Sequence, residues 1–317
     1  MNTPQLPGAQ AISLFPDTPV PPDVPGAELP HWNGQEFADL LALTPVGHNH
    51  FLSRQKEHND SGALFGGQVL AQSLRAAQTT IERPAHVLQA EFLRAGVGDV
   101  PVTYSVENTR DGRGFSTRRV VALQHGRQIL HAQISFTAGE EGPDFITAMP
   151  DVPAPESLPD EATLAVLYAD KLGVTGARRL AAERTVAMRY VEPERMLLGA
   201  PGPPRQMYWM RLHKISNPDT GAQACGIAYL SDYWLAGVFR SAVPDWQAAS
   251  QYYVHSLNHS LFFHNPARAD EWLLFDSQCL WSGHGRTLAL GRIFARDGTP
   301  VATVTQEALL RLGQPRV

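Results

Sequence analysis

Residues 221–239 decide the fold, and they read GAQACGIAYLSDYWLAGVF. The pattern is apolar on nearly every side of a helix and holds a single charged residue, Asp232. A helix without a polar face is usually one that the rest of the protein surrounds. We therefore expect a buried helix at residues 223–238.

Strand patterns lie on both sides of this helix in the sequence. One β-branched or aromatic-rich run precedes it, and four follow it, at residues 206–215, 252–263, 272–281, 287–295 and 300–311. The first half of the chain has a similar order, with a helix pattern at residues 64–81 and strand patterns at 86–94, 102–109, 115–124 and 128–137. Because a sheet must bury one apolar face, this order predicts an antiparallel sheet that curves around each helix.

Short segments of the two halves are also similar. The segment His86-Val-Leu-Gln-Ala-Glu-Phe-Leu matches His255-Ser-Leu-Asn-His-Ser-Leu-Phe, and Asp111-Gly-Arg-Gly matches Ser282-Gly-His-Gly. Similar segments at corresponding places indicate an internal duplication. The expected fold class is therefore α+β, with two related domains in tandem.

Proline marks the boundaries of these domains. Residues 1–30 contain eight prolines, and breakers recur from residue 139 to residue 159. Both stretches lack helix or strand periodicity. We expect a Pro-rich N-terminal arm and lead-in at 1–45, a first domain at 46–138, a linker with a helical segment at 139–195, and a second domain at 196–317.

The composition excludes several classes of protein. A net charge of −5, without a long run of Lys or Arg, argues against a nucleic-acid partner. The two cysteines form no CxxC pair, which argues against a disulfide framework or a cysteine zinc site and fits a reducing compartment such as the cytoplasm. No leader pattern or long apolar run predicts export or membrane insertion.

Three polar residues are candidates for a functional site, although Ser256 would by default make only a solvated or cross-strand pair. A carboxylate in an apolar helix is costly unless it is hydrogen-bonded or used in chemistry, so Asp232 is either a structural acceptor or an acid or base. Gln306 lies in the last strand, where a buried amide needs partners. Ser256 lies in the strand at 252–263, where alternation predicts that it shares a face with Asn258 and that His259 points to the opposite face.

Several segments of the chain carry a resemblance to a known family. They are Phe65-Gly-Gly-Gln-Val, Phe92-Leu-Arg-Ala-Gly, Asp111-Gly-Arg-Gly-Phe-Ser-Thr-Arg-Arg-Val, Ser231-Asp232, His259-Ser-Leu-Phe-Phe-His264 and Val301-Ala-Thr-Val-Thr-Gln306-Glu. In these segments, which span roughly residues 40 to 317, the chain resembles the acyl-CoA thioesterase II family of double-hotdog enzymes. The resemblance implies a tandem double hotdog fold, an acyl-CoA substrate that is hydrolysed to free acid and CoA, and further association into a homo-oligomer.

The resemblance also implies roles for individual residues. In that family an aspartate, a threonine or serine, and a glutamine bind the attacking water, and these positions fall on Asp232, Ser256 and Gln306. A serine keeps the hydroxyl but lacks the methyl group that restricts a threonine rotamer. Asn258 stands where a family member can carry aspartate. We expect Ser256 to orient the water rather than to attack, because no histidine and acid pair that would activate it is recognisable.

Gly66 and Gly67 stand at the start of the first predicted helix. Their backbone N–H groups and the positive helix end are candidates for an oxyanion site. The alternative is that the two glycines allow close packing of the helix. If the two domains pack face to face, this helix start comes near Asp232.

Other functions have less support in the sequence. The chain lacks the G-x-S-x-G motif of α/β-hydrolases, the H-E-x-x-H motif of zinc enzymes and both glycine-rich nucleotide motifs, so we expect neither a metal nor another cofactor. His255, His259 and His264 are expected to be ordinary polar histidines, since alternation separates the third from the other two. A hotdog module that binds acyl-CoA or acyl chains without turnover remains the alternative to an enzyme.

Overall fold

The computed structural model describes residues 36–55, 62–182, 185–200, 202–216, 219–243 and 252–313. Most of the predicted N-terminal arm, residues 1–35, lies outside the described residues.

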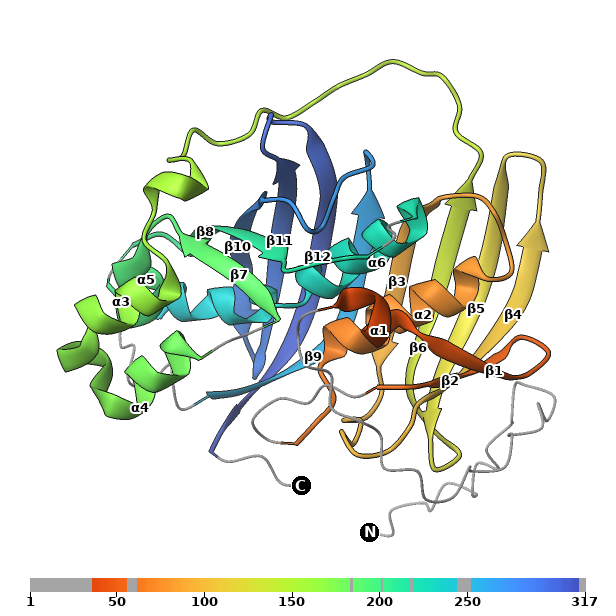
Figure 1. Ribbon diagram of the computed structural model, residues 1–317, viewed down its shortest axis with the longest axis horizontal. Helices are drawn as coiled ribbons and strands as arrows, with labels where there is room; N and C mark the ends of the chain where they lie inside the picture. Colours follow the sequence, from red (N-terminus) through yellow and green to blue (C-terminus); the bar gives the residue numbers. More distant parts are fainter. Residues whose placement is uncertain are drawn as a thin grey trace, which may run out of the picture.

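Antiparallel strands from both halves join into one 12-stranded sheet (Figure 1). The first half contributes β1 (Leu43–Gly47), β2 (His50–Ser53), β3 (Ala85–Phe92), β4 (Thr103–Asp111), β5 (Phe115–Gln124) and β6 (Arg127–Thr137). The second half contributes β7 (Val186–Tyr190), β8 (Arg205–Leu212), β9 (Tyr252–Phe263), β10 (Leu273–Gly283), β11 (Arg286–Ala295) and β12 (Pro300–Leu312). The order across the sheet is β1-β2-β4-β5-β6-β3-β9-β12-β11-β10-β8-β7, so β3 and β9 join the halves.

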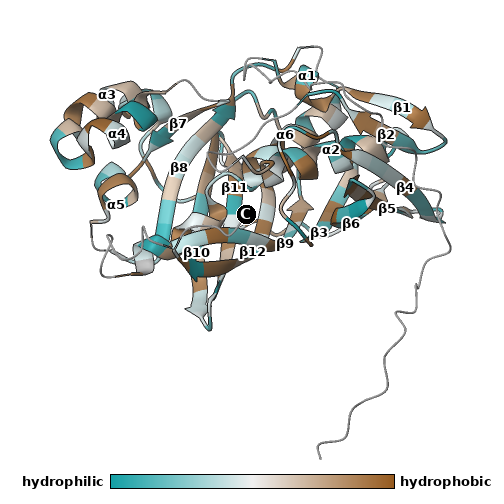
Figure 2. Ribbon diagram, turned by 90° about the horizontal axis from the view of Figure 1, so that it is seen from below, coloured by the Kyte–Doolittle hydropathy of each residue, from teal (hydrophilic) through white to brown (hydrophobic). Residues whose placement is uncertain are grey.

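Two helices occupy the concave face of this sheet, as expected from their apolar sequences. They are α2 (Gly66–Gln78) and α6 (Thr220–Ser231), which contact each other and lie on the same side of the sheet in Figure 2. The predicted arrangement of a curved sheet around a helix in each half is therefore confirmed. Among the described residues, no helix combines the length and the apolar character of a membrane span.

The structure has further helices besides α2 and α6. The helix α1 (Phe37–Leu41) lies against α2 and α6, and η1 (Pro155–Ser157), α3 (Glu161–Leu167), α4 (Ala169–Ala181) and α5 (Pro193–Leu198) lie between the two halves in the sequence. In Figure 1, α3, α4 and α5 gather beside the β7 edge of the sheet. Strand β1 begins within the range expected as a lead-in, and β7 lies within the range expected as a linker. β1 and β7 are the two edge strands of the sheet, and the sequence patterns did not indicate them.

The helix of the second half is shorter than the sequence predicts. A single helix at 223–238 is wrong, because α6 ends at Ser231 and a separate 3-10 helix, η2 (Leu235–Ala242), follows. Asp232 is the residue that caps the end of α6. Its carboxyl group accepts hydrogen bonds from other elements, and a turn at this point directs it toward them.

Candidate active site

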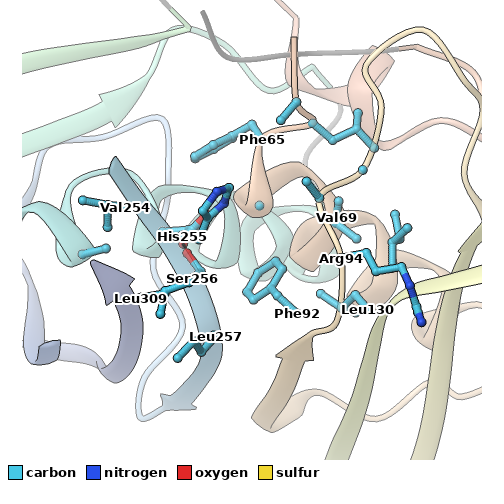
Figure 3. Close-up of a pocket in the computed structure, with 18 of the residues that line it drawn as sticks. Phe65, Val69, Phe92, Arg94, Leu130, Val254, His255, Ser256, Leu257 and Leu309 are labelled. Carbon is cyan, nitrogen blue, oxygen red and sulfur yellow. Dashed lines mark hydrogen bonds between the residues drawn. The ribbon is translucent and has the colours of Figure 1, made fainter. Parts of the chain in front are cut away.

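A pocket of about 550 Å³ lies between the two halves. The first half lines it with the start of α2, the end of β3 and the segment after it, and the start of β6. The second half lines it with Asp232, η2 and the first part of β9. Figure 3 shows His255 and Ser256 on β9, across the pocket from Phe65 and Phe92. The pocket is therefore built by both repeats together.

The structure brings together the three polar residues singled out in the sequence. The Gln306 Nε2 atom donates to Asp232 Oδ1 at 2.5 Å and lies 2.7 Å from Ser256 Oγ. Ser256 Oγ is itself 3.4 Å from Asp232 Oδ1. The three side chains come from the end of α6, from β9 and from β12. Each side chain contacts the other two.

A β-bulge in β9 decides which side chains face this cluster. Ser256 pairs with Ala308 and Asn258 pairs with the next residue along β12, so Leu257 is an extra residue in β9. One extra residue reverses the alternation of side chains. The predicted sharing of a face by Ser256 and Asn258 is therefore wrong: Ser256 shares its face with His259 instead.

Asn258 consequently takes no part in the cluster. Its side chain bonds Glu307, with the amide nitrogen 3.4 Å from Glu307 Oε2 and the amide oxygen accepting from Glu307 N at 3.2 Å. Asp232 therefore supplies the carboxyl group of the cluster, and the asparagine at position 258 does not alter the cluster.

Gln306 lies behind the other two residues rather than in the pocket. Its side chain is fully buried, while Asp232 and Ser256 belong to the pocket lining. The two hydrogens of its amide nitrogen are directed to Asp232 and Ser256. Because a primary amide has only two such hydrogens, Gln306 has no further donor to offer. It fixes the two residues that face the pocket.

The start of α2 lies directly against Asp232. The backbone N–H of Gly67 hydrogen-bonds the Asp232 carboxyl group. A Cβ atom on Gly66 would lie 2.5 Å from Asp232 Oδ2, and one on Gly67 would lie 2.5 Å from Tyr229 O. Only glycine fits such close approaches. The expectation that the first helix begins near Asp232 is confirmed, and the packing reason for the glycines is present as well.

Burial dominates the electrostatics of Asp232. Loss of contact with water raises the pKa of Asp232 to about 7, although the hydrogen bonds from Gln306, Ser256 and Gly67 act in the opposite direction. A carboxyl group with such a pKa is present in both protonation states near neutral pH. It can therefore accept a proton from a bound molecule and release it again.

His259 is a site residue that sequence reasoning missed. Its side chain is 0% exposed, Nε2 lies 2.9 Å from Ser231 Oγ, and Nδ1 lies 4.0 Å from Asp232 Oδ1. Burial lowers the pKa of His259 to about 3, so the ring is neutral. The expected alternation placed this ring away from Ser256, and no local signal in the sequence predicts the bulge that reverses it. His264, by contrast, bonds Thr303 Oγ1 outside the pocket.

The duplicated half does not repeat the polar cluster. At the end of α2, Gln78 lies against the start of α6, as Asp232 at the end of α6 lies against the start of α2. The bulge residue is His86 in β3 and Leu257 in β9, so by the register of the duplicated strands Ala85 and Ile134 take the positions of Ser256 and Gln306. The pseudo-symmetric place therefore has an amide and two apolar side chains, and the chain holds one cluster of this kind among its described residues.

Comparison with known proteins matches both halves. Residues 55–137 match the model of the acyl-CoA thioesterase N-terminal domain, and residues 150–310 match that of the C-terminal domain. Acyl-coenzyme A thioesterase 8 from Rattus norvegicus is 36% identical over 289 residues, which cover 88% of this chain and 89% of that protein.

Solved structures agree with this assignment. The crystal structure of the acyl-CoA thioesterase II TesB2 from Mycobacterium marinum has a TM-score of 0.70 and 33% identity, and the match covers 88% of this chain and 99% of that one. A protein described as having the hot dog fold, from Alicyclobacillus acidocaldarius, has a TM-score of 0.65 at 20% identity, covering 88% of this chain and 98% of that one, and supports the fold alone. The chain therefore belongs to the acyl-CoA thioesterase family, and it is a thioester hydrolase with the tandem hotdog fold.

Proposed function

We propose that this chain hydrolyses fatty acyl-CoA to free acid and CoA with a water molecule that Asp232 activates and Ser256 orients. The observation that carries the proposal is the position of these two side chains in the wall of a pocket, with Gln306 fixing both from behind. The function and the fold come from the family; the roles of the three residues are proposed from their geometry and chemistry.

The chemistry follows from the groups that face the pocket. Ionised Asp232 takes a proton from the water while the water oxygen attacks the thioester carbonyl carbon. The hydroxyl of Ser256 donates its hydrogen to Asp232 and accepts the second O–H of the water, which directs a lone pair of the water oxygen at the substrate. The C–S bond then breaks, and the thiolate is a good leaving group because a thiol has a pKa of about 8.5.

The negative charge on the carbonyl oxygen needs donors. Gly66 lines the pocket at the start of α2, where the positive end of the helix favours a negative ligand. The N–H of Gly67 bonds Asp232 and thereby acts on the base. We therefore propose Gly66, with the helix start, as the oxyanion site, and Gly67 as a residue that positions Asp232.

The apolar wall of the pocket suits the acyl part of the substrate. Both halves contribute aliphatic and aromatic side chains, among them Leu64, Val69, Phe92, Leu130, Val254, Leu257 and Leu309. Burial of methylene groups against such a wall is favourable by about 0.8 kcal/mol each. This favours fatty acyl groups over short polar ones.

The first prediction concerns the substrate range. The purified protein should hydrolyse medium- to long-chain acyl-CoA without added metal or nucleotide, because Asp232 itself supplies the base. Thiol release from acyl-CoAs of graded chain length measures this, with a chelator added in a parallel series. Tight binding of acyl-CoA without thiol release would instead favour the alternative, a hotdog module that only binds its ligand.

The second prediction separates an orienting hydroxyl from a nucleophile. Ser256→Ala should lower kcat by about tenfold, whereas Ser256→Thr, which keeps the hydroxyl, should remain active. The hydroxyl is not expected to form an ester, because Ser256 Oγ contacts Asp232 and Gln306 and no histidine bonds it among the described residues. Mass spectrometry of the enzyme during turnover should find no acyl adduct; a stoichiometric adduct on Ser256 would contradict the mechanism.

A cytoplasmic location and a homo-oligomeric assembly stay predictions from the sequence and the family resemblance.

A further inference from the structure

His259 lies beside Asp232 but uses only one of its two ring nitrogens. Nε2 lies 2.9 Å from Ser231 Oγ. Nδ1 lies 4.0 Å from Asp232 Oδ1 and has no hydrogen-bond partner among the described residues, although the ring is fully buried. Buried polar atoms without partners are rare in folded proteins and need an explanation. The position of this one, facing the proposed base, points to a role in the reaction.

Ser231 decides where the proton of the ring lies. Its Oγ donates its only hydrogen to Ala228 O at 2.8 Å. Toward His259 the hydroxyl can therefore only accept, which assigns the ring proton to Nε2. The neutral ring then presents the lone pair of Nδ1 to Asp232. In this arrangement Nδ1 is a hydrogen-bond acceptor that has no donor among the described residues.

We propose that His259 is a positioning residue for Asp232, and that its Nδ1 accepts a hydrogen bond from Asp232 when the carboxyl group is protonated. The proposal rests on the proposed function, in which Asp232 takes the proton of the water. An ionised carboxylate has no hydrogen to offer, so its lone pairs face the lone pair of Nδ1. The protonated group does have one, and a shift of about 1 Å brings the two atoms to hydrogen-bonding distance.

The effect on the reaction is to favour the acid form of Asp232. An O–H bond of the water breaks, its proton moves to the carboxylate, and the water oxygen bonds the carbonyl carbon while the carbonyl electron pair moves to oxygen. After the C–S bond breaks, the thiolate takes the proton from Asp232 and restores the carboxylate. His259 stabilises the protonated carboxyl group between these steps. It stays neutral throughout, so it neither gains nor loses a proton itself.

Other titratable or charged groups lie near Asp232 and restrict the choice of experiment. His255 on β9, Arg240 on η2 and Arg94 after β3 line the same pocket, and Tyr233 follows Asp232 in the chain. Burial lowers the pKa of His255 and of Arg240. A pH profile of turnover therefore contains contributions besides that of Asp232. A spectroscopic signal from Asp232 alone must therefore be measured in addition to the pH profile.

Two substitutions test the proposal from different sides. His259→Leu removes both ring nitrogens, so that no acceptor of this side chain faces Asp232. Ser231→Ala keeps the ring but removes the group that holds the ring proton on Nε2, so the proton can move to Nδ1 and bond the ionised carboxylate. Both changes should lower the pH at which Asp232 titrates by about one unit, which is the size expected from the loss or gain of one hydrogen bond. Both should also lower kcat by about tenfold.

The readout is the infrared band of the protonated carboxyl group, assigned to Asp232 by its loss in Asp232→Asn. His264→Leu is the matched control, because His264 does not line the pocket and its Nε2 lies 2.8 Å from Thr303 Oγ1. It should change neither the band nor kcat. Urea unfolding curves show whether each variant is folded, and Ser231→Ala keeps the test open if His259→Leu does not fold.

An unchanged titration of Asp232 in folded His259→Leu or Ser231→Ala would overturn the proposal. The infrared titration needs no substrate. A wild-type protein that fails to hydrolyse acyl-CoA would therefore count against the proposed function, while this measurement would still decide the relation between His259 and Asp232.

Discussion

Asp232→Asn should lower kcat by about 10²–10⁴-fold, because an amide cannot take a proton from water. The change in shape is small, and the amide oxygen can still accept the bond that Gln306 Nε2 makes to Oδ1 at 2.5 Å. KM should therefore stay nearly constant. In the wild type, kcat should rise as the pH increases through about 7, since the ionised form of Asp232 is the base. Steady-state thiol release across this range measures both effects.

Asp276→Asn is a matched control for this experiment. Asp276 is another buried aspartate, but it lies on β10, bonds Arg205 and Arg292, and does not line the pocket. Its neutralisation should destabilise the fold by about 1–3 kcal/mol, because two arginines lose a charged partner. The kcat of the folded fraction should change little. If Asp232→Asn behaves like this control, the carboxyl group of Asp232 is structural and the base must be sought elsewhere.

The same substitution should have an effect on stability that depends on pH. The pKa of Asp232 is raised to about 7 in the folded protein, against about 3.9 in an unfolded chain. Between these values the folded state binds more protons than the unfolded state, so the free energy of unfolding falls as the pH rises through this range. Asn does not titrate. The stability of Asp232→Asn relative to the wild type should therefore be greater at about pH 8 than at about pH 5, as measured by urea unfolding.

Gln306→Ala should lower kcat by about 10²-fold, although Gln306 lies behind the pocket. The amide holds both residues that face the water, and a displacement of about 1 Å in an active site can cost a factor of this size. Gln72→Ala is the control, since Gln72 is an equally buried glutamine that bonds Leu40 O and Tyr104 and does not line the pocket. It should reduce stability and leave kcat per folded molecule nearly unchanged.

The double substitution tests whether Gln306 acts through Asp232. Once Asp232→Asn has removed the base, a displacement of the side chain at position 232 can lower the activity only a little further. The double variant should therefore lose far less activity than the product of the two single losses. Losses that multiply would mean that Gln306 contributes to the reaction independently of Asp232.

Local patterns determined the order of the elements in this protein. The predicted strand at 115–124 coincides with β5, and the predicted strand at 252–263 coincides with β9. Periodicity of apolar residues is a local property, so a single sequence contains it. The burial of α6 followed in the same way from a helix without a polar face. The strands β1 and β7 were missed because they are short and have little pattern of their own.

Single residue types also pointed to the site before any geometry was known. A lone carboxylate in an apolar helix pattern marked Asp232, and the family resemblance added Ser256 and Gln306. The resemblance could supply their identity because each lies in a short matching segment. It supplied neither the end of α6 at Ser231 nor the hydrogen bonds that Asp232 accepts from other elements.

Only the tertiary structure decided how these residues face one another. The bulge at Leu257 reverses the alternation of β9 and brings Ser256 and His259 onto the face of Gln306. Such a bulge depends on the pairing of β9 with β12, whose partners lie about fifty residues apart in the chain. The contact of Gly67 with Asp232 likewise depends on the packing of one repeat against the other. The sequence by itself determined which groups were available for chemistry; strand register and helix packing, which are set by distant contacts, decided which of them meet.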